Sequence, residues 1–309
     1  TNPIATPANN IINSLKCGNA IIISPSPKGI AGCERLIHYI HLEFEKIGIN
    51  KDLVQMIPAP GTKIKTQQML EETDLVIVTG SQNNVRRAYT SGTPAIGVGA
   101  GNVTVIIDET ANLKEAAEKI AASKTFDNAT SCSSENSIII LDEVYNSFID
   151  ELSLVGCATL PRSMENIITD RLWKKGQLNR EAIAQDADIL INALDLNDHV
   201  PKGTKFIGIE TDGIGDSYPL SGEKLSRVVS IYKAKDFSDS VLKAKKMLMH
   251  YGAGHSIGIH TNDKLRANKL AMTLPTCRVI VNQAHCFATG GSFNNGMPFS
   301  LSMGCGSWG

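Results

Sequence analysis

The sequence has little charge imbalance and no long hydrophobic run. Its 30 basic and 31 acidic residues give a formal net charge of −1, and no basic cluster indicates a nucleic-acid or membrane partner. No apolar stretch reaches the length that a membrane-spanning helix requires, and the first residues do not resemble a signal peptide. With 42% hydrophobic residues in 309, the composition predicts a globular, cytoplasmic protein of one large domain or two smaller ones.

The sequence also lacks a cysteine pattern. Seven cysteines are scattered along it, and none forms a CxxC pair or a Cys/His cluster with zinc spacing. We therefore expect no structural zinc, no disulfide framework and a reducing environment. The seven are Cys17, Cys33, Cys132, Cys157, Cys277, Cys286 and Cys305.

What the sequence does contain is an alternation of short apolar runs and amphipathic segments. The runs are rich in Ile and Val and nearly continuously apolar, which is typical of parallel strands covered by helices. The pattern predicts an α/β fold. Strands are expected at 19–24, 53–60, 74–81, 94–108, 136–143, 188–194, 205–210, 227–234, 255–261 and 277–283, and helices at 33–49, 65–73, 82–91, 112–124, 143–155, 164–177 and 238–252.

A domain boundary is expected just before Cys132, near 126–130. Residues 1–128 would form one α/β domain and residues 129–309 a second, with ligands binding where the two meet.

Cys132 lies in the polar stretch FDNATSCSSENSIII (126–140), between a predicted helix and a predicted strand. Cysteine usually packs in the core as a small hydrophobe, so a thiol among Ser, Thr and Glu favours a nucleophile over a packing residue. A cysteine hydrolase would need a histidine partner, and His255 or His285 could serve.

Two glycine-containing stretches invite a nucleotide interpretation. VIVTGSQNNV (76–85) reads as a strand, a Gly80–Ser81 turn and a helix start, which could hold a phosphate or be an ordinary turn. GTPAIGVGAGNV (92–103) is followed by a strand rather than a helix, so it does not match the dinucleotide fingerprint. Its glycines are expected to let the chain pass close to another segment.

Taken together, several segments carry a family resemblance that no single one would. They are TNPIATP (1–7), VTGSQNNVRRAYTSGTPAIGVGAGNVTVIID (78–108), FDNATSCSSENSIII (126–140), GEKLSRVVSIYKAKDF (222–237), GAGHSIGIHT (252–261) and SLSMGCGSWG (300–309). In this order the chain resembles the CoA-acylating branch of the aldehyde dehydrogenase superfamily. Within that branch it most resembles the acylating sulfoacetaldehyde dehydrogenases, in the stretches SQNNVRRAY (81–89), CSSENS (132–137) and FNNGMPFSLSMGCG (293–306). The resemblance implies two Rossmann-like three-layer α/β/α domains, the first binding the dinucleotide and the second carrying the nucleophile.

The resemblance also assigns catalytic roles. Cys132 would add to the aldehyde, Asn2 of the Thr-Asn-Pro motif would donate to the resulting oxyanion together with the backbone N–H of the cysteine, and His255 would lie near the acylating site. Hydride transfer to NAD or NADP would leave an acyl-enzyme thioester.

For the cofactor, the resemblance places Thr79, Gly80 and Ser81 beside the phosphates. Glu223, which on pattern alone reads as part of a solvated turn, would orient the nicotinamide ribose, and Ser24 and Pro25 would lie near the adenosine ribose. Ser26 and Lys28 stand where an acidic residue often holds the ribose of NAD, and this favours NADP.

The acyl acceptor follows from an absence. Hydrolytic relatives carry a glutamate base at the position that Gly97 occupies in IGVGA (96–100). Without a base water is a poor nucleophile, whereas a thiol ionises readily. Coenzyme A is therefore the expected acceptor.

The stretch NQAHCFATGGSFNNGM (282–297) would contact the substrate, with His285, Ser292, Asn294 and Asn295 as candidates to recognise a sulfonate. Acetaldehyde and succinate semialdehyde are the nearest alternative substrates. Members of the family continue beyond both ends of this sequence, so we expect a truncated chain, a homo-oligomeric full-length protein and, as a further alternative, an inactive nucleotide-binding fragment.

Overall fold

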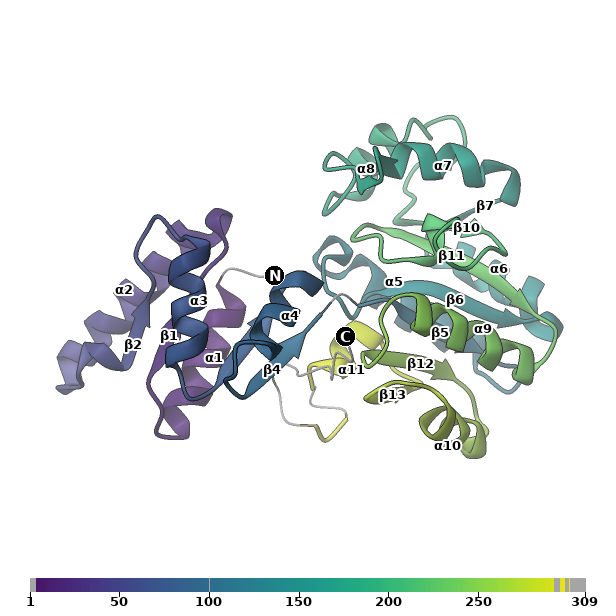
Figure 1. Ribbon diagram of the computed structural model, residues 1–309. Helices are drawn as coiled ribbons and strands as arrows, with labels where there is room; N and C mark the ends of the chain where they lie inside the picture. Colours follow the sequence, from purple (N-terminus) through teal and green to yellow (C-terminus); the bar gives the residue numbers. More distant parts are fainter. Residues whose placement is uncertain (1–3, 100, 292–294, 298–299, 301–309) are drawn as a thin grey trace. The chain divides into compact units, whose positions relative to one another are not determined.

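The computed structural model describes residues 4–99, 101–291, 295–297 and 300. The chain divides into two compact units, one reaching to Val98 and the other running from Gly99 to Asn295 (Figure 1). The predicted boundary at residues 128 and 129 differs from this division. The segment 99–128 joins the second unit because its strand and helix both pack into the large sheet of that unit.

The first unit contains two short parallel strand pairs covered by helices. In chain order it consists of α1 (Ala5–Lys16), β1 (Ile21–Ile23), α2 (Ile30–Ile47), β2 (Val54–Met56), α3 (Lys63–Glu72), β3 (Val76–Thr79), α4 (Gln82–Tyr89) and β4 (Ala95–Val98). β1 pairs with β2, and β3 with β4. Ile11, Ile37 and Phe44 pack α1 and α2 onto β1 and β2.

The second unit is built on one parallel sheet of seven strands in the order β13-β12-β5-β6-β11-β10-β7. The strands are β5 (Val103–Ile107), β6 (Glu135–Leu141), β7 (Cys157–Leu160), β10 (Phe206–Glu210), β11 (Val228–Ala234), β12 (Ser256–His260) and β13 (Arg278–Val281). Every pairing within this sheet is parallel, which confirms the predicted fold class.

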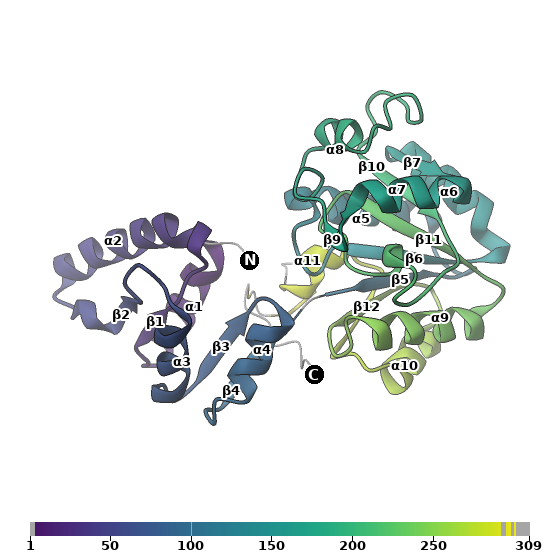
Figure 2. The ribbon, with the colours of Figure 1, turned by 45° about the horizontal axis from the view of Figure 1, so that its top comes forward.

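Helices cover both faces of this sheet and make three layers (Figure 2). Ile138 and Ile140 of β6 face α5 (Leu113–Thr125) and α6 (Tyr145–Leu154). Ile139, whose side chain faces the opposite side of the sheet, packs in the cluster of α9 (Phe237–His250) and α10 (Lys264–Thr273). This alternation is why a continuously apolar strand is stable only between two helical layers.

Two further helices and a hairpin complete the unit. α7 (Glu165–Leu172) and α8 (Ala187–Ala193) pack against β7 and β10. Between them β8 (Trp173–Lys174) and β9 (Gln177–Leu178) form an antiparallel hairpin. α11 (His285–Thr289) follows β13.

Two sequence predictions were wrong here. The run at 188–194 was expected to be a strand, but it lies in α8, where Leu190 and Ile191 face the core and Asp186 precedes the first turn. A short apolar run of this kind has no period that separates strand from helix. β7 was not predicted, and the helix expected at 164–177 ends at Leu172, because Lys175 and Gly176 both have positive φ and turn the chain into the hairpin.

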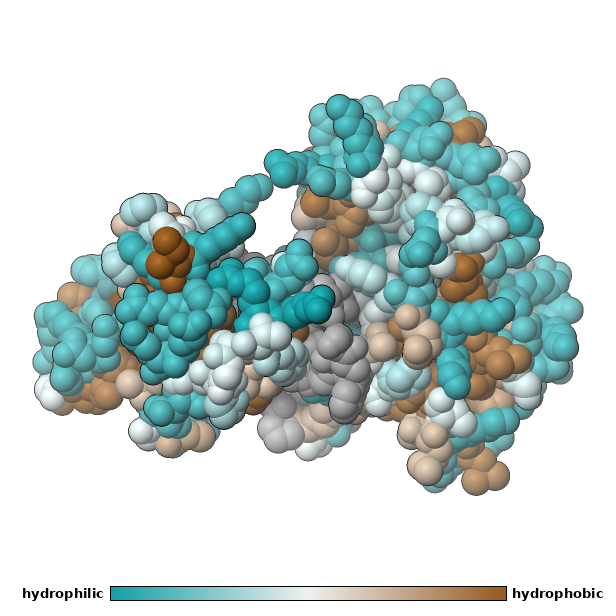
Figure 3. Space-filling model, viewed as in Figure 1, coloured by the Kyte–Doolittle hydropathy of each residue, from teal (hydrophilic) through white to brown (hydrophobic). Residues whose placement is uncertain are grey.

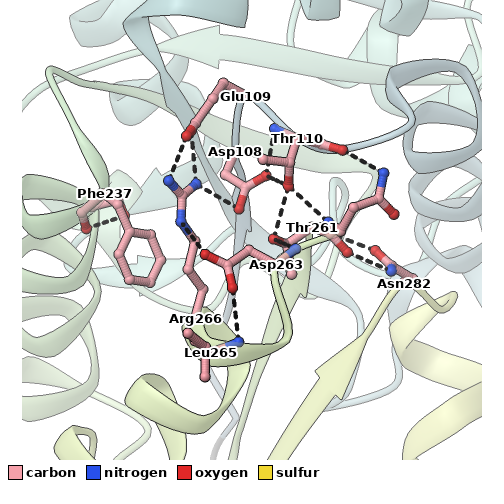
Figure 4. A network of polar contacts seen from close by, with 11 residues as sticks. Asp108, Glu109, Thr110, Phe237, Thr261, Asp263, Leu265, Arg266 and Asn282 are labelled. Atoms are coloured by element: carbon pink, nitrogen blue, oxygen red, sulfur yellow. Dashed lines mark hydrogen bonds and ion pairs between the residues drawn. The ribbon is translucent and has the colours of Figure 1, made fainter.

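A polar network lies at the carboxyl ends of β5 and β12 (Figure 4). Asp108, directly after β5, is fully buried and lies 2.7 Å from the Arg266 guanidinium. Its other carboxylate oxygen accepts hydrogen bonds from the backbone and side chain of Thr110 at 2.8 and 2.7 Å. Glu109 forms the second ion pair with Arg266. Ligands bind at the carboxyl edge of many α/β sheets, but at these two strands it is occupied by charge pairs.

Hydrophobic side chains on the face shown in Figure 3 are scattered rather than gathered over one element. Among the described residues, no helix combines the length and hydrophobicity that crossing a membrane would require.

Candidate active site

Cys132 lies in a loop whose backbone is held in a rare conformation. Three consecutive residues before it, Asp127, Asn128 and Ala129, have φ values of 47°, 52° and 58°. The Thr130 hydroxyl donates to the carboxylate and the carbonyl of Asp127, both at 2.8 Å. Non-glycine residues in the left-handed region are uncommon, and clusters of them mark functional loops more often than ordinary turns.

A glycine brings a second segment directly against this loop. A Cβ placed on Gly101 would lie 2.1 Å from the carbonyl oxygen of Cys132, so only glycine fits at this position. The predicted close approach of the chain is confirmed here and at Gly97, where a Cβ would lie 2.6 Å from Val85 and 2.9 Å from Tyr89.

Cys132 begins a chain of three hydrogen bonds. Its sulfur lies 3.4 Å from Nε2 of His255. Nδ1 of His255 lies 2.8 Å from the hydroxyl of Ser256, and the same hydroxyl lies 2.8 Å from Nε2 of His285. The structure therefore brings together three of the residues singled out from the sequence and adds Ser256 between the two histidines.

Burial keeps the two histidines of this chain neutral. It lowers the pKa of His255 to about 4, with a contribution from Arg278, and the pKa of His285 to about 3. The Cys132 thiol has a raised pKa because of burial and the nearby Glu223 carboxyl. Attack by this thiol therefore needs hydrogen-bond donors that stabilise its thiolate.

Glu223 belongs to the same site. Its carboxyl group accepts a hydrogen bond from the backbone N–H of Gly101, and burial raises its pKa to about 7. Gly101 therefore contacts both Cys132, the candidate nucleophile, and Glu223, the glutamate expected at the nicotinamide ribose.

Four residues of the site stand before strands, whereas His285 follows β13. Gly101 precedes β5, Cys132 precedes β6, Glu223 precedes β11 and His255 precedes β12, and these four strands are neighbours in the sheet. The candidate active site is therefore at the amino edge of the second unit's sheet, opposite the edge at which Arg266 pairs with Asp108.

Sequence reasoning missed a buried ionic group beneath the site. Lys124 is fully buried, and its ammonium donates to the backbone carbonyl of Glu135 at 2.8 Å. Burial lowers the pKa of Lys124 to about 8 and raises that of Glu135 to about 7. Lys224, also buried, donates to the carbonyls of Asn136 and Gly222, and burial lowers its pKa. The position of Lys124, one helical turn after the buried Ile120, was the one sequence signal of this burial.

The cofactor candidates of the first unit lie after two different strands. Ser24, Pro25, Ser26 and Lys28 follow β1; the two serines and the lysine are exposed and Pro25 is half-buried. Thr79 ends β3, Gly80 follows it, and Ser81 precedes the first turn of α4, with no side-chain hydrogen bond capping that helix.

The substrate candidates have different environments. Among the described residues His285 is buried and bonded to Ser256, while Asn295 is half-buried and donates to the carbonyl of Ala288 at 3.0 Å. Asn2, Ser292 and Asn294 lie outside the described residues. No group of three potential ligands that could hold a metal ion was found within the described part of the chain.

Comparison with known proteins places this geometry in a family. Residues 2–155 match the model of the aldehyde dehydrogenase family. The chain is 50% identical to an acylating sulfoacetaldehyde dehydrogenase of Cupriavidus necator and 36% identical to one of Bilophila wadsworthia. All of this chain aligns in both cases, but it spans only 63% and 67% of the lengths of those proteins.

A solved structure agrees with these matches. An acetylating aldehyde dehydrogenase from Geobacillus thermoglucosidasius superposes with a TM-score of 0.92 at 30% identity, covering 99% of this chain and 67% of that one. The predicted aldehyde dehydrogenase fold is thereby confirmed.

Proposed function

The chain belongs to the aldehyde dehydrogenase family, and on this basis we propose that it oxidises a short aldehyde to an acyl thioester and transfers the acyl group to coenzyme A. The observation that carries the proposal is the pairing of Cys132 with His255 at 3.4 Å, beside Glu223 and Gly101. The matched relatives, named as acylating enzymes, support the same chemistry.

In the proposed reaction the Cys132 thiolate adds to the aldehyde carbon. The new C–S bond gives a tetrahedral adduct whose oxygen needs hydrogen-bond donors, for which the Cys132 backbone N–H and the side chain of Asn2 are candidates by resemblance. The neutral ring of His255 lies on the sulfur side of this adduct. Loss of hydride from the carbon leaves a thioester on Cys132, and the thiolate of coenzyme A then displaces Cys132.

The nicotinamide cofactor, when bound, would accept the hydride. The first unit offers a fitting cradle for its phosphates: α4 has no side-chain cap, and a Cβ on Gly80 would meet only the amide of Asn84, at 3.5 Å. Glu223 would hold the nicotinamide ribose. The exposed Ser26 and Lys28 suit a 2′-phosphate, so we propose NADP over NAD.

Coenzyme A as the acceptor is supported by the packing at Gly97. The space that a side chain would need there is filled by Val85 and by Tyr89, whose hydroxyl accepts a hydrogen bond from the Gly97 backbone N–H at 2.9 Å. A glutamate base for water therefore has no room at this position, and a thiol acceptor does not require one.

Sulfoacetaldehyde is the proposed substrate, because the relatives from Cupriavidus necator and Bilophila wadsworthia both carry that name. Acetaldehyde and succinate semialdehyde are the alternatives. Asn295, with Ser292 and Asn294, is a candidate to recognise the sulfonate. A cytoplasmic location and a homo-oligomeric assembly remain predictions.

The test measures formation of NADPH and NADH by this chain from sulfoacetaldehyde, acetaldehyde and succinate semialdehyde, with and without coenzyme A. Cys132→Ala is the control for the nucleophile. Turnover that requires both Cys132 and coenzyme A, fastest with sulfoacetaldehyde and NADP, is the expected result.

Other outcomes contradict separate parts of the proposal. Equal turnover without coenzyme A would mean that water is the acceptor. Turnover retained in Cys132→Ala would remove the nucleophile assignment. No turnover, together with binding of NADP seen by calorimetry, would show that this chain is a nucleotide-binding fragment.

A further inference from the structure

Ser256 couples the protons of two buried histidines. Its hydroxyl has one hydrogen, yet it lies 2.8 Å from Nδ1 of His255 and 2.8 Å from Nε2 of His285. It can donate to one ring only and must accept from the other. Since both rings are neutral at pH 7, fixing the tautomer of one histidine fixes that of the other.

Two arrangements satisfy these bonds. In the first, Nε2–H of His285 donates to Ser256, Ser256 donates to Nδ1 of His255, and Nε2–H of His255 points at the sulfur of Cys132. In the second every proton is reversed: Nδ1–H of His255 donates to Ser256, and the lone pair on Nε2 faces Cys132. The proton of His285 then lies on its Nδ1.

The surroundings of His285 distinguish the two arrangements. Its Nδ1 is buried and has no hydrogen-bond partner among the described residues. The ring packs so closely on β12 that a Cβ on Gly258 would lie 3.0 Å from this nitrogen. The second arrangement would bury an N–H donor without an acceptor, a defect that is rarer in proteins than an unshared acceptor. The first arrangement leaves only a lone pair unshared.

We propose that Ser256 and His285 are positioning residues that hold His255 in the Nε2–H form, as a hydrogen-bond donor to the Cys132 sulfur. His255 then does not take the thiol proton in the resting protein. It stabilises the thiolate and the sulfur of the adduct instead. This inference deepens the proposed function, since it rests on Cys132 as the nucleophile.

The charged groups around this chain are few. Glu223 faces Cys132, Arg278 acts on both His255 and His285, and His260 acts on His285. Glu135 faces the backbone N–H of His285, which donates to its carboxylate at 3.3 Å. Burial raises the pKa of Glu223 and that of Glu135 to about 7, so the tautomer is best measured at pH 7 and again at pH 8.5.

The direct test is long-range ¹H–¹⁵N NMR of the chain labelled with ¹⁵N-histidine, with His255 and His285 assigned by substitution. We expect a protonated Nε2 and an unprotonated Nδ1 in both rings at both pH values. A protonated Nδ1 on His255 would overturn the proposal. Neither the aldehyde nor the cofactor enters this measurement, so its failure is distinguishable from failure of the proposed function.

The second test is the pH profile of Cys132 alkylation by iodoacetamide. Ser256→Ala and His285→Phe should each slow alkylation at pH 7 about tenfold, the effect of one lost hydrogen bond to a charged sulfur. They should also move the apparent pKa of Cys132 upward, and Ser256→Thr, which keeps the hydroxyl, should restore both.

Ser137→Ala is the matched control. Ser137 is a buried serine on β6, which β5 separates from β12 in the sheet, and its hydroxyl has no partner among the described residues. It should leave the alkylation profile unchanged. The positioning role would be overturned if Ser256→Ala, His285→Phe, Ser256→Thr and Ser137→Ala all gave the same alkylation profile. It would also be overturned if Ser256→Thr behaved like Ser256→Ala.

Discussion

The contact between Gly101 and Cys132 predicts a large effect from adding a single methyl group. A Cβ on residue 101 would lie 2.1 Å from the Cys132 carbonyl oxygen, whereas such contacts are not found below 3.0 Å. In Gly101→Ala the two segments must therefore separate by roughly 1 Å, and a displacement of that size costs on the order of 100-fold in rate. The same movement strains the hydrogen bond from Gly101 N–H to Glu223.

The assay compares the rate of reduced-cofactor formation with the rate of Cys132 alkylation in the same variant. Both should fall, the first by about 100-fold, because the whole loop moves and not only the cofactor side. Gly61→Ala is the control, since a Cβ there meets nothing within 4 Å and the backbone conformation is ordinary. A Gly101→Ala variant with an unchanged rate and an unchanged unfolding midpoint would refute the geometric argument.

Two further predictions concern stability. Burial lowers the pKa of His260 to about 4. As the pH falls, His260 is therefore protonated in the unfolded chain before it is protonated in the folded chain, and stability is lost from pH 6.5 towards pH 4. Between pH 7 and pH 5 the free energy of unfolding, measured with urea, should fall by about 2 kcal/mol more in the unsubstituted chain than in the His260→Gln variant. Equal falls in the two proteins would contradict this. Arg266→Met should cost about 3 kcal/mol, because it leaves the carboxylate of Asp108 buried without its ion pair. Lys119→Met, which removes a surface ion pair with Glu115, should leave the unfolding midpoint nearly unchanged, and similar midpoints for the two variants would argue against the role of the Arg266 network.

The sequence predicted the strands of the large sheet well where Ile and Val runs were long. Ile138 to Ile140, apolar on both faces, can be stable only inside a covered sheet, and β6 (Glu135–Leu141) agrees closely with the strand predicted at 136–143. Short runs gave no such constraint. The residues of α8 have the composition of a strand, and only packing against β10 and α7 makes them helical.

The candidate site was predictable in its members but not in its connections. Local polarity marked Cys132, yet nothing near residue 255 in the sequence indicates that His255 would lie 3.4 Å from that sulfur. That contact depends on β12 pairing with β5 and β5 with β6, which are long-range pairings. The unit boundary after Val98 could not be derived from the sequence for the same reason, because it depends on which sheet β5 enters.

The strand order has a consequence for the timing of synthesis. β6 follows β5 closely in the sequence, whereas about 150 residues separate β5 from β12, which is inserted beside it. Pairings so distant in sequence form late, because the intervening loop must be closed first. Until then Cys132 has no histidine beside it. While the segment between β6 and β12 is being made, the nascent chain therefore carries Cys132 without its histidine, and the pair is completed only when β12 is in place.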